Sequence, residues 1–111
     1  MDLEKNYQLW RKEKFNNKEG FFPVFADFKK EMRKLSPGAI SLYIYFGLHS
    51  NNRTGTSFHS IGTIANYFGK SPRTITNWIR ELTDAKLIER YQEKKGGKTI
   101  TYLIPYGDEY L

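Results

Sequence analysis

Three polar side chains recur at helical spacing in the segment that begins at Ser71. Arg73, Asn77 and Arg80 lie opposite its apolar residues on a helical projection. Thr76 lies beside them. An arginine can donate two hydrogen bonds to guanine, and an asparagine can both donate to and accept from adenine. Such a helix face could read base edges in a major groove, and the alternative is a solvated polar face without a ligand.

Hydroxyl groups and free amides at two expected helix starts have the chemistry for phosphate contacts. The first amides of a helix have no partner within the helix and point toward an approaching anion. A serine at that position can also simply cap the helix, and the two roles are compatible. The candidate phosphate contacts are Ser60, Lys70, Ser71 and Thr74.

A second group of cations lies at the tip of an expected hairpin. Residues 88–94 predict one strand, and residues 98–104, which alternate apolar and polar side chains, predict a second. Gly96 and Gly97 would form the turn between them. A tip of this kind suits the DNA backbone or the minor groove, although an ordinary charged hairpin would look the same. Its cations are Lys94, Lys95 and Lys98.

A central helix precedes these segments. Ser36 followed by Pro37 is a strong start signal, and the helix should run to about His49. It has one apolar face for the core and a second that a surface helix would not need. The second face could receive the N-terminal helix of the same chain or of a partner. The first face comprises Ala39, Leu42, Tyr43 and Phe46, and the second comprises Ile40, Ile44 and Leu48.

Two shorter helices follow, joined by a tight turn. Ser60 caps the first, which ends at Gly69, and Ser71 caps the second. Ala65 is small enough to let the helices approach each other, and Trp78 shares the apolar face of the second helix. We therefore expect Trp78 to pack in the core rather than to stack on a base.

This pair of helices resembles the helix-turn-helix of bacterial regulators, because Ala65, Gly69, Thr74, Ile75 and Trp78 fall at that family's intervals. Lys70 departs from the pattern, which usually has a small apolar residue there, and predicts a more exposed turn. The span 35–105 resembles the winged helix-turn-helix domains of plasmid and phage replication initiators and related small regulators. The resemblance lies in "LSPGAISLYIYF" and "SPRTITNWIRELTDAKLIER".

The resemblance implies an α+β fold that is mainly α, a winged helix-turn-helix with an extra N-terminal helix and a wing sheet of two or three strands. It also implies sequence-specific binding to double-stranded DNA. We expect three parts along the chain, namely an amphipathic helix and linker over residues 1–20, the winged domain over 21–105, and a tail over 106–111. Pro23 confines residues 21–25 to an edge strand or an extended lead-in.

The N-terminal helix is a candidate dimerisation arm. Leu3, Tyr7 and Trp10 share one of its faces, and the tail adds Tyr106 and Tyr110. Two copies of the chain would read an inverted or direct repeat. We therefore expect double-stranded DNA as a partner, and the sequence leaves both a monomer and a homodimer open as the assembly.

Composition agrees with a nucleic-acid partner. The 111 residues have a net charge of +6, and residues 36–80 contain no Asp or Glu, although chance could produce such a stretch. The absence of cysteine removes disulfides and Cys-based zinc sites. Because neither a signal peptide nor a membrane segment is visible, we expect a cytoplasmic protein.

An enzyme would need a convergent group of titratable side chains, and the sequence shows none. His49 and His59 look isolated, so no catalytic residue, metal site, cofactor or small-molecule ligand is expected. The favoured function is a stand-alone transcriptional regulator of a plasmid or other mobile element. Two alternatives stay open, the DNA-binding domain of a replication initiator and a winged helix that binds only an acidic protein.

Overall fold

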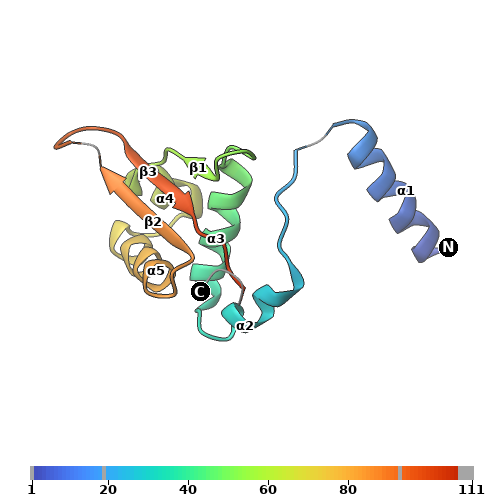
Figure 1. Ribbon diagram of the computed structural model, residues 1–111, viewed down its shortest axis with the longest axis horizontal. Helices are drawn as coiled ribbons and strands as arrows, with labels where there is room; N and C mark the ends of the chain where they lie inside the picture. Colours follow the sequence, from blue (N-terminus) through green and yellow to red (C-terminus); the bar gives the residue numbers. More distant parts are fainter. Residues whose placement is uncertain (1, 19, 93, 108–111) are drawn as a thin grey trace.

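The computed structural model describes residues 2–18, 20–92 and 94–107. Within those ranges the chain has a mainly helical α+β fold, as predicted, with a three-stranded sheet (Figure 1). In chain order the elements are α1 (Leu3–Asn16), η1 (Ala26–Phe28), α2 (Lys29–Met32), α3 (Pro37–His49), β1 (Thr56–Ser57), α4 (Ile61–Phe68), α5 (Pro72–Asp84), β2 (Ile88–Gln92) and β3 (Thr99–Leu103).

The core forms where α3, α4 and α5 meet. The residues of the first apolar face of α3 are buried, as predicted, and Ile64 of α4 joins them. From α5, Ile75 and Leu82 are fully buried. Apolar spacing in the sequence thus identifies the packed faces correctly, because burial of these side chains is the main force that holds the helices together.

The sheet has the order β1-β3-β2, and both pairings are antiparallel. Thr56 of β1 and Glu89 of β2 both lie opposite Tyr102 of the central strand. Among the described residues, the pairing of the hairpin strands runs from Ile88 opposite Leu103 to Gln92 opposite Thr99, within the predicted strands. The connection between them carries the predicted lysines.

The second apolar face of α3 is only partly covered. Ile40 and Ile44 are half-buried and Leu48 is exposed. Helix α1 of the same chain does not cover this face, because it stands apart from the other elements (Figure 1). Of the two helices that could cover this face, the N-terminal helix of the same chain is therefore excluded.

Helix α1 is solvent-exposed along its whole length. None of its residues is buried, and Leu3 and Trp10 keep 72% and 54% of their surface exposed. The radius of gyration is 16.0 Å, whereas a compact domain of this length would have about 13 Å. Within one chain, its described contacts are with the lead-in that follows it and not with the other helices or strands.

The segment between α1 and η1 is an extended lead-in rather than an edge strand. Phe22 lies over Gly47 of α3, and its ring centroid is 5.6 Å from that of Tyr43. The N–H of Phe25 donates to the hydroxyl of Tyr106 at 2.8 Å. Tyr106 therefore packs against its own chain, whereas Tyr110 lies outside the described residues.

Candidate nucleic-acid interface

The turn between α4 and α5 has the geometry of a helix-turn-helix. Gly69 ends α4 in the left-handed region, with φ 63° and ψ 38°, and the N–H of Lys70 donates to the carbonyl of Ala65 at 3.0 Å. Ser71 then caps α5, and Pro72 occupies the first helical position. Lys70 is exposed, as the departure from the family pattern predicted.

Trp78 fixes α5 against the rest of the domain. Its indole ring occupies the space beside Gly38, where an added Cβ would come within 2.1 Å of the Trp78 Cε2 atom. It also meets the Phe68 ring edge-on, with centroids 5.6 Å apart and planes 88° apart. Trp78 is thus a packing residue, as predicted, and is not free to stack on bases.

The opposite face of α5 carries the predicted polar side chains. Arg73, Asn77 and Arg80 are all exposed. Thr76 is half-buried, and its hydroxyl donates to the carbonyl of Pro72 at 2.9 Å, so it retains only acceptor capacity for a ligand. The structure brings the three long side chains to one face, and Thr76 lies at the edge of that face.

The serines at the starts of α4 and α5 are both caps. Ser60 accepts from the N–H of Thr63 at 3.1 Å, and Ser71 accepts from the N–H of Thr74 at 3.2 Å. Each serine oxygen also lies 3.0 Å from the hydroxyl of its threonine. The sequence prediction included Thr74 but missed Thr63, although the repeated Ser-x-x-Thr spacing marks both positions.

The wing is the connection between β2 and β3. The N–H of Gly97 donates to the carbonyl of Lys94 at 2.7 Å, and Gly96 has a φ of 80°. Lys94 and Lys95 are exposed. The exposed Lys98 is directed back along the sheet, with its Nζ 5.8 Å from the centroid of the Phe58 ring. The hairpin connection lies on the same side of the molecule as α5, opposite α1 (Figure 1).

Arg90 of β2 links the wing to the core, and the sequence prediction missed it. Its Nη1 donates to Thr101 Oγ1 at 2.7 Å, and its Nη2 donates to the carbonyl of His59 at 3.2 Å. The guanidinium carbon lies 5.7 Å from the centroid of the Phe46 ring, and burial lowers the pKa of Arg90. Alternation along β2 gives the only sequence signal, since it places Arg90 on the same face as Ile88.

The expectation of isolated histidines is wrong. The rings of His49 and His59 lie 4.9 Å apart between centroids and meet edge-on, and Tyr45 packs against both. His49 Nδ1 lies 2.8 Å from the carbonyl oxygen of Tyr45, whereas the buried Nδ1 of His59 has no hydrogen-bond partner among the described residues. The described residues contain no group of three or more potential metal ligands of the His, Cys, Asp and Glu types.

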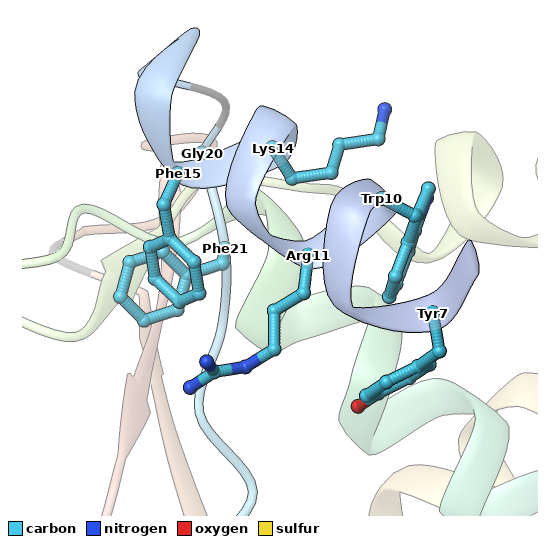
Figure 2. A pocket seen from close by; sticks show the side chains of 7 residues that line it. All are labelled: Tyr7, Trp10, Arg11, Lys14, Phe15, Gly20 and Phe21. Carbon is cyan, nitrogen blue, oxygen red and sulfur yellow. The ribbon is translucent and has the colours of Figure 1, made fainter. Parts of the chain in front are cut away.

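A hollow of about 410 Å³ lies between α1 and the lead-in that follows it (Figure 2). The rings of Phe15 and Phe21 meet near their edges with centroids 5.4 Å apart, and the Arg11 guanidinium lies 5.2 Å from the Phe15 centroid. Figure 2 shows Tyr7 and Trp10 farther along the same helix. The hollow belongs to the exposed face of α1, which stands apart from α5 (Figure 1).

No helix among the described residues is both long and apolar enough to cross a lipid bilayer.

The comparisons with known proteins agree with this geometry. Residues 33–88 match a family model described as a helix-turn-helix domain. A crystal structure of a MarR-like transcriptional regulator from Thermotoga maritima aligns with a TM-score of 0.55 and 14% sequence identity. The alignment covers 98% of this chain and 70% of that one, and it establishes a shared winged-helix fold. A search of the curated proteins found no match.

Proposed function

Because the chain belongs to the helix-turn-helix domain family, we propose that it binds double-stranded DNA sequence-specifically and regulates transcription. The observation that carries this proposal is the division of α5 into two faces. Ile75 and Leu82 bury one face completely, and this burial fixes the direction of the exposed one. The exposed face carries Arg73, Asn77 and Arg80, whose donors match purine edges in the major groove.

The proposed docking places α5 in the major groove and the wing on the backbone. The capped starts of α4 and α5 would face phosphates, which favour the partial positive charge of a helix N-terminus. Lys94 and Lys95 would neutralise phosphates without reading sequence. The absence of Asp and Glu from residues 36–80 supports this orientation, since a carboxylate there would repel the DNA.

We further propose that residues 1–20 form a dimerisation arm. Leu3, Tyr7 and Trp10 are largely exposed in the single chain, and the partly covered face of α3 gives a second apolar surface. A contiguous group of exposed apolar side chains is typical of a surface that binds a partner. Two joined copies would place two recognition helices on one repeat.

The sequence resemblance to initiators and small regulators supports a regulator of a plasmid or other mobile element, acting on DNA in the cytoplasm. The tail, residues 106–111, begins with Tyr106, which packs onto the winged domain of residues 21–105. A DNA-binding domain of a replication initiator would use the same α5 face, so its target would be an origin instead of an operator.

The decisive experiment is selection of binding sites from a random duplex library, followed by footprinting on the selected DNA. We expect enrichment of a short motif that occurs as an inverted or direct repeat. Recovery of no motif, together with binding of an acidic protein through α5, would contradict the proposal and favour an adaptor. The footprint also gives the symmetry of the complex.

A further inference from the structure

The outer side of the three-stranded sheet is a second, separate surface. Side chains alternate between the two sides of a strand. Ser57 and Thr101 are opposite each other and buried, so they face the helices, and Arg90 joins them above Phe46. The neighbouring residues Ile100 and Tyr102 of β3 therefore face outward.

Three aromatic rings surround Ile100 on this outer side. Tyr91 lies opposite Ile100 on β2, and Tyr102 lies two residues along β3. Phe58, which directly follows the inward-facing Ser57, continues the alternation outward. We call Phe58, Tyr91, Ile100 and Tyr102 the aromatic sheet face.

The rings of this face are open to solvent, whereas the residue between them is not. Phe58, Tyr91 and Tyr102 are 56%, 54% and 38% exposed, whereas Ile100 is 9% exposed. The Tyr91 and Tyr102 rings are nearly perpendicular, with centroids 5.7 Å apart. The Tyr91 and Tyr102 rings thus pack against each other and do not project singly into solvent.

The charges around the aromatic sheet face favour an anionic ligand. Lys98 lies beside the Phe58 ring, and Lys94 and Lys95 continue the cationic rim into the wing. Glu89 also lies on this side, and its carboxylate accepts a hydrogen bond from the Tyr91 hydroxyl at 2.7 Å. Exposed rings beside cations match a ligand that offers flat bases and phosphates together.

We propose that the aromatic sheet face binds single-stranded DNA. Bases stack on Tyr91, Tyr102 and Phe58, and the lysines contact the phosphates. A duplex cannot bind in this way, because its bases are already stacked and their faces are not accessible. The proposal uses neither α5 nor the dimerisation arm, and it shares only the wing lysines Lys94 and Lys95 with the proposed duplex interface.

The test compares two fluorescent strands of equal length and charge, an oligo-dT of about 12 nucleotides and its abasic counterpart. Anisotropy titrations of the full chain should give affinity for oligo-dT about tenfold or more above that for the abasic strand. Tyr91→Ala and Tyr102→Ala should each lower the affinity for oligo-dT about fivefold or more. Tyr91→Phe and Tyr102→Phe keep the rings and should bind oligo-dT as the wild type does.

Equal affinity for the two strands would overturn the proposal, since charge alone would then explain binding. It would also be overturned if the alanine variants were folded by circular dichroism and bound oligo-dT like the wild type, because the rings would then make no contact with the bases. Arg73→Ala is the matched control, because it should leave binding of oligo-dT unchanged. If Arg73→Ala weakens duplex binding but leaves oligo-dT binding unchanged, the two sites are distinguishable.

Discussion

The carboxylate of Glu81 holds both the backbone and the side chain of Ser36. Glu81 Oε1 accepts from the Ser36 N–H at 2.7 Å, and Oε2 accepts from the Ser36 hydroxyl at 2.6 Å. The Ser36 oxygen in turn accepts from the N–H of Ala39 at 3.2 Å. Helix α5 is therefore hydrogen-bonded to the N-cap residue of the central helix α3.

Glu81→Ala should lower the free energy of unfolding by about 1 to 3 kcal/mol, because it leaves part-buried donors of Ser36 without an acceptor. Urea denaturation monitored by circular dichroism measures the change. Glu13→Ala on the exposed helix α1 is the control and should stay within about 0.5 kcal/mol of the wild type. Equal stability of the two variants would show that the Glu81 contact contributes nothing.

Arg73→Ala should weaken binding to the selected duplex by about 1 to 3 kcal/mol and relax the preference at one or two base pairs. Loss of a bidentate contact to one base accounts for both effects. Electrophoretic mobility shifts on the selected site and its single-base variants measure them. Arg33→Ala, on an exposed arginine outside the proposed interface, should bind as the wild type does. Unchanged base preference in Arg73→Ala would rule out a reading role.

Lys95→Ala should weaken binding to selected and random duplexes by the same factor. A wing lysine that contacts phosphate releases about one counterion, so the dependence of log K on log salt should become shallower by about one. Titrations at several salt concentrations give this slope. A loss confined to the selected site would mean that Lys95 reads bases instead.

The stability of the fold should fall in mild acid because of His59. Burial, and then the nearby His49 and Arg90, lower the pKa of His59 in the folded state. As pH falls, His59 is therefore protonated first in the unfolded chain, at the ordinary histidine pKa of about 6.5. The stability that depends on neutral His59 is present above that pKa and is lost as pH falls below it. Urea midpoints should decrease from about pH 7.5 to about pH 5, and His59→Gln should reduce the decrease. An identical decrease in that variant would assign the effect to other groups.

Tyr7→Glu combined with Trp10→Glu should convert a dimer into a monomer without loss of helix content in the winged domain. Two carboxylates in the apolar face of α1 would have to be desolvated in an interface, at a cost that isolated charges rarely recover. Light scattering over a range of protein concentrations measures the mass. A wild-type chain that remains monomeric at high concentration, both free and on DNA, would rule out the proposal that residues 1–20 form a dimerisation arm.

Local signals in the sequence predicted the helix starts well. Ser36, Ser60 and Ser71 each cap a helix in the structure, because the capping hydrogen bond joins residues only three apart. The apolar face of α5 and the packing of Trp78 were predicted from spacing for a similar reason, since a helix repeats every 3.6 residues. The apolar face of α5 also fixes which side of the helix carries Arg73, Asn77 and Arg80, the candidates for base reading.

Contacts between distant residues were not predictable in this way. Glu81 and Ser36 are 45 positions apart, and Arg90 and the His59 carbonyl are 31 apart, so no local pattern joins them. Lys86 has a positive φ of 59° just after α5, a position where glycine is the usual signal. Such features depend on how the helices and the sheet pack together.

Helix α1 buries nothing against its own domain, and the lead-in is first anchored at Phe22. Under the proposal that α1 is a dimerisation arm, substitutions along it should change assembly without lowering the stability of the winged domain. Assembly and domain stability can therefore change independently of each other among relatives of this chain. If the proposed arm sets the assembly, the same winged domain joined to a different N-terminal helix would pair differently on DNA while α5 kept its proposed contacts.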